Sequence, residues 1–168
     1  GLNLFFIVQE YGNKASKFSL ETGTEHANRA LNAALSLGVP KNAEIYFAVD
    51  FDATDSEISK NIIPYFTAIR NSECSSYYNI GVYGTRNVCS RIKKSVGFDF
   101  YFVSDASYGF SENLGYTMPD SWAFDQFKTD ITLSNSTTSV NIDKVAVSYK
   151  DNAVSTIKIT PEKVGKNF

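Results

Sequence analysis

Apolar runs that alternate with amphipathic segments constrain the fold of this chain more than any other feature of its sequence. Four runs have the length and composition of buried strands: residues 2–9, 45–50, 79–83 and 98–104. Two more strands are expected at residues 122–127 and 141–147. Parallel strands need a connection that crosses over the sheet, and most segments between these runs are long enough to form a helix. The pattern therefore predicts an α/β protein with a parallel sheet.

Three of the connecting segments have the spacing of helices. In the first, apolar residues recur at helical intervals on one face: Ala27, Ala30, Leu31, Ala34 and Leu35. The second is expected to begin with a capping box between Thr54 and Glu57, and Pro64 should kink or interrupt it. The third is expected to end at Gly97, because glycine commonly follows the last turn of a helix.

The composition is that of one ordinary globular domain. Of 168 residues, 43% are hydrophobic and 20% are charged. A net charge of −2 argues against a nucleic-acid binder, and no apolar stretch approaches the ~18 residues that a membrane span needs. With His26 as the single histidine and with Cys74 and Cys89 towards opposite ends of a strand, we expect neither a zinc site nor a disulfide. The domain is expected at residues 1–149, followed by a tail or a final strand at 150–168.

Two acids, Asp50 and Asp52, follow the second strand with a spacing of two residues. Side chains alternate along an extended chain, so this spacing predicts that both carboxylates lie on the same side. Like charges held this close resist ionising together, so the pair is costly unless a metal, a shared proton or a substrate uses it. Polar residues also stand at three other strand ends, namely Tyr83, Asp105 and Gln126. The carboxyl ends of parallel strands are where such folds place their active sites.

The acid pair admits three interpretations. In the first, one acid caps the next helix and the other is a solvated loop residue. Alternatively, Asp50-Phe51-Asp52-Ala53-Thr54 is the D-x-D-x-T loop of a Mg²⁺-dependent phosphotransferase, which also needs a downstream acidic pair that no apolar strand supplies. In the third, the carboxylates belong to a glycosidase, which needs no metal and which suits a chain with ten Tyr, thirteen Phe and one Trp.

The later strands add candidate acids. Asp143 lies within a short apolar strand, where a carboxylate is unexpected, and its neighbour Lys144 should point to the opposite face. The strand at 122–127 is expected to place three side chains on one face: Trp122, Phe124 and Gln126. Asp125 then falls on the other face, so both faces carry a polar group. This pattern suits a strand that lies between a barrel lumen and a layer of helices.

A series of motifs becomes recognisable in chain order: IYFAVDFDATD, NIGVYGTRNVC, FYFVSDASYGFSENLGY, PDSWAFDQF and NIDKVAVS. From about Leu2 to Ser148, the chain strongly resembles the glycoside hydrolase-like family called domain of unknown function 1906. That family is a relative of the family 25 glycoside hydrolases, which are lysozymes that cut peptidoglycan. The resemblance implies a parallel (β/α) barrel of the TIM type that lacks its first one or two strands in this chain.

The resemblance also implies the roles of the candidate residues. Asp50 and Asp52 fall on the D-x-E pair of the lysozymes, with Asp52 as the general acid and Asp50 as its electrostatic partner. Asp143 falls on a later catalytic acid that positions substrate or water. The substrate-binding residues are expected to be Gln9, Tyr83, Asp105, Trp122, Asp125 and Gln126. Asp52 is one methylene shorter than the glutamate of the lysozymes, and Asp125 replaces an aromatic residue.

These features predict a glycoside hydrolase-like domain that acts on bacterial cell-wall polysaccharide, with peptidoglycan as the substrate and no cofactor. The first alternative is a carbohydrate-binding or structural module that has lost catalysis, and the second is the phosphotransferase. The resemblance implies an extracellular or wall-associated location. Because the chain begins with glycine, we expect an upstream segment that was removed or that belongs to a longer protein.

Overall fold

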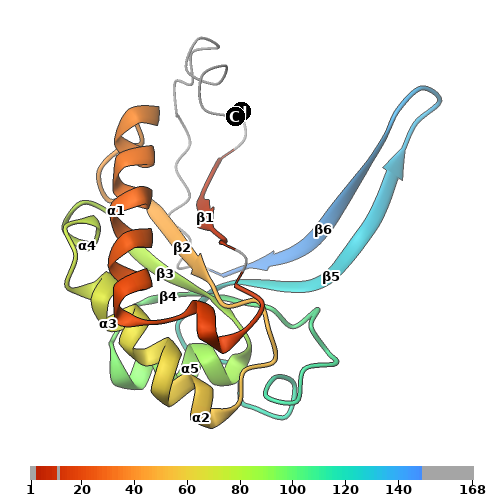
Figure 1. Cartoon of the computed structure of the whole chain (residues 1–168). Coiled ribbons are helices and arrows are strands. Elements are labelled where there is room, and N and C mark those ends of the chain that lie inside the picture. Colours follow the sequence, from red (N-terminus) through yellow and green to blue (C-terminus); the bar gives the residue numbers. More distant parts are fainter. Residues whose placement is uncertain (1–2, 11, 149–168) are drawn as a thin grey trace.

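Six strands follow one another across a single sheet in chain order (Figure 1). The computed structural model describes residues 3–10 and 12–148. The strands are β1 (Phe6–Val8), β2 (Glu44–Ala48), β3 (Asn79–Gly84), β4 (Phe100–Val103), β5 (Trp122–Ser134) and β6 (Ser139–Val147). The first five are parallel to their neighbours, and β6 runs antiparallel to β5. The parallel α/β architecture predicted from the apolar runs is confirmed.

Helices occupy the connections between the parallel strands. They are η1 (Ala15–Lys17), α1 (Leu20–Leu37), α2 (Asp55–Glu57), η2 (Ile58–Ile62), α3 (Ile63–Arg70), α4 (Cys74–Tyr77) and α5 (Arg86–Ser95). The predicted capping box is present, since Thr54 Oγ1 accepts a hydrogen bond from Glu57 N and the Glu57 carboxylate accepts one from Thr54 N. The interruption expected at Pro64 takes the form of the π-helical turn η2, which directly precedes α3. Because α2, η2 and α3 are contiguous, Pro64 changes the hydrogen-bond pattern of the segment without ending its helical conformation.

The larger hydrophobic core lies between the helices and the outer face of the sheet. Alternate residues of β1 to β4 enter it, among them Ile45 and Phe47 of β2 and Tyr101 and Val103 of β4. Figure 1 shows the helices gathered on this side of the sheet. Because the strand period is two, the residues between them are directed to the inner face.

The inner face carries a second, aromatic cluster that shows how strongly the sheet is curled. Phe5, just before β1, stacks on Phe124 of β5 with ring centroids 4.4 Å apart. Strands that are four places apart in a flat sheet are separated by about 19 Å. The sheet is therefore a half-barrel, and the expected TIM barrel is confirmed only to this extent. Gly81 of β3 makes room for the cluster, because a Cβ atom there would lie 2.3 Å from the ring of Tyr46.

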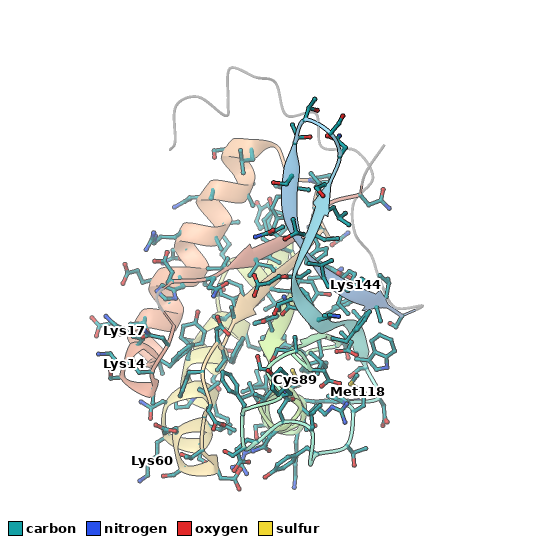
Figure 2. The ribbon with its side chains drawn as sticks, turned by 90° about the vertical axis from the view of Figure 1, so that its right-hand side faces the viewer. Lys14, Lys17, Lys60, Cys89, Met118 and Lys144 are labelled. Atoms are coloured by element: carbon teal, nitrogen blue, oxygen red, sulfur yellow. The ribbon has the colours of Figure 1, made fainter. Side chains whose placement is uncertain are left out.

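The β5–β6 hairpin is longer than predicted. The sequence predicts that its first strand ends at Phe127. In the structure, β5 continues to Ser134 and β6 begins at Ser139. The two strands form a ribbon that projects from the sheet (Figures 1 and 2). Such a ribbon is held by cross-strand hydrogen bonds and needs no apolar core. At its tip, Asn135 Oδ1 accepts hydrogen bonds from the backbone N–H groups of Thr137 and Thr138.

The cysteines are free and buried, as expected from their separation. Cys74 lies on α4 and Cys89 on α5, and Figure 2 shows Cys89 among interior side chains, away from the hairpin. Residues 149–168, which include the tail or final strand expected at 150–168, lie outside the described residues. Within the described part of the chain, no helix is both long and apolar enough to span a membrane.

Candidate functional site

A cleft of about 290 Å³ lies on the inner face of the half-barrel. Its lining comes from five strands and from the two residues that flank β1: Phe5, Ile7, Gln9, Tyr83, Phe102, Gln126, Asp143 and Val145. The apolar side chains form a floor that continues into the aromatic cluster. The polar side chains stand towards the carboxyl ends of the parallel strands, which is where active sites of α/β barrels lie. The structure therefore brings together four residues that the sequence analysis selected separately.

A chain of hydrogen bonds orders the polar side of the cleft. The Tyr83 hydroxyl donates to Gln126 Oε1 at 2.7 Å, and Gln126 Nε2 donates to Asp143 Oδ2, also at 2.7 Å. The other oxygen of Asp143 accepts from the backbone N–H of Asp130 at 3.1 Å. Asp143 thus has both oxygens fixed although the residue is exposed. Asp130 can supply this N–H because a register shift in the hairpin gives it a positive φ of 57°.

Asp50 stands at the other side of Tyr83. Its Oδ2 accepts a hydrogen bond from Gln9 Nε2 at 2.9 Å, which joins the ends of β1 and β2. Burial raises the pKa of the Tyr83 phenol, and the charges of Asp50 and Asp143 raise it further. The phenol is therefore protonated at neutral pH and serves as a hydrogen-bond donor between two carboxylates.

Asp52 does not share this environment. Both of its carboxylate oxygens accept hydrogen bonds from the backbone N–H and the hydroxyl of Ser111, at 3.0–3.1 Å. Neither Asp52 nor Asp50 is among the residues that line the described cleft, but Asp50 contacts the lining residue Gln9. The prediction that Asp50 and Asp52 lie on the same side assumed an extended chain, but β2 ends at Ala48. Beyond the strand the alternation no longer applies, and Asp52 turns towards the segment after β4.

A second polar cluster lies on the side of the sheet that faces the helices. Arg86, at the start of α5, donates from Nε to Asp105 Oδ1 at 2.8 Å, and its Nη2 forms an ion pair with Asp105 Oδ2. Burial raises the pKa of Asp125, and the Asp105 carboxylate raises it further. Arg86 and a hydrogen bond from the Asp105 backbone oppose this shift. Asp105 and Asp125, both predicted to bind substrate, therefore do not line the cleft.

Trp122 also lies away from the cleft. It packs against the core on the helix side, whereas Phe124 belongs to the inner cluster. The prediction that Trp122 and Phe124 share a face was wrong, because the pairing of β4 with β5 shifts by one residue between Tyr101 and Phe102. Such a bulge reverses the alternation locally.

Sequence reasoning missed the apolar floor and the partner of Asp52. Phe5 and Phe102 were read only as parts of strands, and nothing near Ser111 indicates a contact with an acid 59 residues away. The period-two alternation could have placed Phe5, Ile7 and Gln9 on one face, since the side chain of Gln9 marks which face is polar. His26, to which no role was assigned, bonds through Nδ1 to the Tyr65 hydroxyl at 2.9 Å on the helix side.

In residues 3–10 and 12–148, no three His, Cys, Asp or Glu side chains form a group that could hold a metal ion. Asp50 and Asp52, the pair of the D-x-D-x-T motif, accept hydrogen bonds from Gln9 and Ser111, which lie on different segments.

A curled parallel sheet with polar side chains at the carboxyl ends of its strands is the architecture of barrel-type α/β domains. The chain belongs to the family described as the Rv2525c-like, glycoside hydrolase-like domain, whose profile matches residues 1–147. The family predicted from the sequence motifs is thereby confirmed.

Two curated relatives come from Bacillus subtilis strain 168. The uncharacterized protein FadG is 45% identical over 172 residues, which cover 100% of this chain and 30% of that protein. The uncharacterized protein YbfG is 43% identical over 164 residues, which cover 94% of this chain and 22% of that protein. The chain thus spans less than a third of the length of these relatives.

Two crystal structures of the Mycobacterium tuberculosis Tat-secreted protein Rv2525c share the fold. The complex with HEPES has a TM-score of 0.66 at 16% identity and covers 92% of this chain and 71% of Rv2525c. The complex with L-tartrate has a TM-score of 0.59 at 19% identity and covers 77% of this chain and 58% of Rv2525c. At this identity the likeness concerns the fold alone.

Proposed function

We propose that this domain binds a glycan of the bacterial cell wall in the inner cleft and hydrolyses a glycosidic bond there. The observation that carries the proposal is the cleft itself, in which an aromatic floor meets a wall of ordered amide, phenol and carboxylate groups. Sugars present apolar C–H faces and a rim of hydroxyl groups, so they need both kinds of surface. Membership in a glycoside hydrolase-like family supports the substrate class.

The proposed chemistry uses the two carboxylates beside Tyr83. Glycosidases pair one carboxyl group that exchanges a proton with the leaving oxygen and one that stabilises or attacks the sugar cation. Asp143, with both oxygens held by hydrogen bonds, suits the second role. Asp50 is exposed and held by the Gln9 amide, and we assign it the proton exchange. Because the Tyr83 hydroxyl donates to Gln126, its oxygen would accept a hydrogen bond from a hydroxyl of the sugar bound between them.

The test is turnover on purified peptidoglycan, measured as the release of reducing ends. Asp50→Asn and Asp143→Asn should each lower the rate by at least ~100-fold, because general acid–base catalysis contributes about that much. Asp99→Asn is the matched control. Asp99 precedes β4 and so lies at the amino end of that strand, away from the carboxyl ends at the polar side of the cleft, and its substitution should leave the rate unchanged. Equal rates in all three variants, or no turnover by the unmodified domain, would refute the hydrolytic mechanism.

A binding module without catalysis is the second candidate. It is favoured by Asp52, which stands at the position of the lysozyme glutamate but has both oxygens engaged with Ser111. In this case the domain would be retained on cell walls without releasing reducing ends, and Phe102→Ala would reduce retention. For either function we propose an exported location, because the wall glycan lies outside the cytoplasmic membrane and the structural neighbour Rv2525c is a Tat-secreted protein.

A further inference from the structure

The segment between β4 and β5 crosses the ends of the central strands. Near its start, the backbone N–H of Ala106 donates to the carbonyl of Gln126 at 2.6 Å. Five residues later, Ser111 donates to the Asp52 carboxylate. Gln126 belongs to β5 and Asp52 follows β2, and β3 and β4 lie between these two strands. Residues 106–111, here called the arch, therefore pass the carboxyl ends of β3 and β4, whose side chains Tyr83 and Phe102 line the cleft.

The arch is built on a rigid base. Asn113 is fully buried, and its Nδ2 donates to the carbonyls of Ser104 at 2.9 Å and Ser107 at 3.2 Å. Its Oδ1 accepts from the backbone N–H of Arg86 at 3.1 Å, which fixes it to the start of α5. A turn within the arch is closed by the N–H of Phe110 and the carbonyl of Ser107 at 3.0 Å.

Tyr108 lies at the centre of this turn with 81% of its surface exposed. It is the most exposed of the large hydrophobic residues in the described part of the chain. Its ring therefore adds little to the core, although the backbone that carries it is held at both ends. An exposed aromatic ring on an ordered loop at these strand ends can stack on the face of a sugar ring.

We propose that the arch is a second sugar subsite, in which the Tyr108 ring stacks on a sugar unit next to the one in the cleft. This inference rests on the proposed glycan binding and extends it from a single sugar to a chain of linked sugars. Asp52 is then a positioning residue, because its contact with Ser111 holds the arch over the strand ends. Since Asp50 and Asp52 are two residues apart, the cleft and the arch are fixed to the same short segment.

The experiment compares the affinities of a disaccharide and a hexasaccharide of N-acetylglucosamine, measured by calorimetry. Tyr108→Ala should weaken hexasaccharide binding about fivefold and leave disaccharide binding unchanged, because one lost aromatic contact is worth about 1 kcal/mol. Tyr108→Trp should restore the affinity for the hexasaccharide. Tyr77→Ala is the control, since Tyr77 is an exposed tyrosine on α4, outside the cleft and the arch.

The outcomes separate this inference from the proposed function. If the unmodified domain binds neither sugar, glycan binding itself is wrong. If it binds both and Tyr108→Ala behaves like Tyr77→Ala, the subsite is wrong. An equal loss for disaccharide and hexasaccharide would also overturn it, because Tyr108 would then act on the cleft.

The role of Asp52 is tested through its partner. Ser111→Ala removes the hydroxyl donor and should weaken hexasaccharide binding severalfold, whereas Ser111→Thr keeps the hydroxyl and should restore it. In the double variant with Tyr108→Ala, the loss should not exceed that of Tyr108→Ala alone, because both changes act on the same contact. Additive losses would show that Ser111 and Asp52 do not act through the arch.

Discussion

The stacking of Phe5 on Phe124 offers a sharp test of the half-barrel. The two rings belong to segments that are distant in a flat sheet, so their contact exists only if the sheet curls. Replacing each ring by leucine, singly and together, removes the contact while it keeps an apolar side chain at both positions. Because such swaps cost about 1 kcal/mol each, the variants should remain folded.

The magnitude follows from the geometry. The ring centroids lie 4.4 Å apart with an interplanar angle of 23°, which is a stacked pair. Aromatic pairs of this kind contribute about 0.5–1.5 kcal/mol beyond their buried area. The free energies of unfolding, measured by urea titration, should therefore show a coupling of that size between Phe5→Leu and Phe124→Leu.

A second cycle provides the control. Ile92→Val changes a fully buried residue of α5 in the core on the helix side, and its coupling to Phe5→Leu should be within about 0.5 kcal/mol of zero. A coupling between Phe5 and Phe124 no larger than that of the control pair would contradict the curled sheet. The inner cleft would then not exist, because its walls come together only in a curled sheet.

Two further predictions concern ionisable groups. Because burial and a neighbouring carboxylate raise the pKa of Asp125, the folded protein binds its proton more tightly than the unfolded chain does. The contribution of Asp125 to the free energy of unfolding should thus fall as the pH rises from its ordinary pKa through the raised one. Asp125→Asn, followed by urea titration at several pH values, should gain stability relative to the unmodified domain across that window, and a loss there would refute the assignment. Burial also raises the pKa of Cys74 to about 11 and raises that of Cys89, so neither thiol should react with Ellman's reagent at pH ~8 until the protein unfolds. Rapid reaction of one thiol in the folded protein would contradict this.

Much of the parallel half of the fold could be predicted from periodicity. Apolar runs located β2, β3 and β4, and helical spacing located the buried face of α1 except for Leu35, which is half exposed. The hairpin could not be predicted in full, because beyond Phe127 its strands are exposed on both sides. Exposed ribbon strands lack the apolar alternation by which strands are recognised in a sequence.

The candidate site was predictable only where strands are regular. Tyr83, Gln126 and Asp143 were selected as residues at or near strand ends, and the structure places them in one hydrogen-bonded chain. Trp122 was misplaced because a bulge between β4 and β5 leaves no mark in the composition. Asp52 was misplaced because its partner, Ser111, approaches through tertiary folding alone.

The most direct measurement is a crystal structure of the domain soaked with a soluble peptidoglycan fragment. We predict a sugar ring against Phe102 in the inner cleft, with its polar atoms within hydrogen-bond distance of Tyr83 and of a carboxylate oxygen of Asp50 or Asp143. A sugar bound elsewhere on the domain, or an empty cleft at millimolar fragment, would contradict the assignment of this cleft as the glycan site.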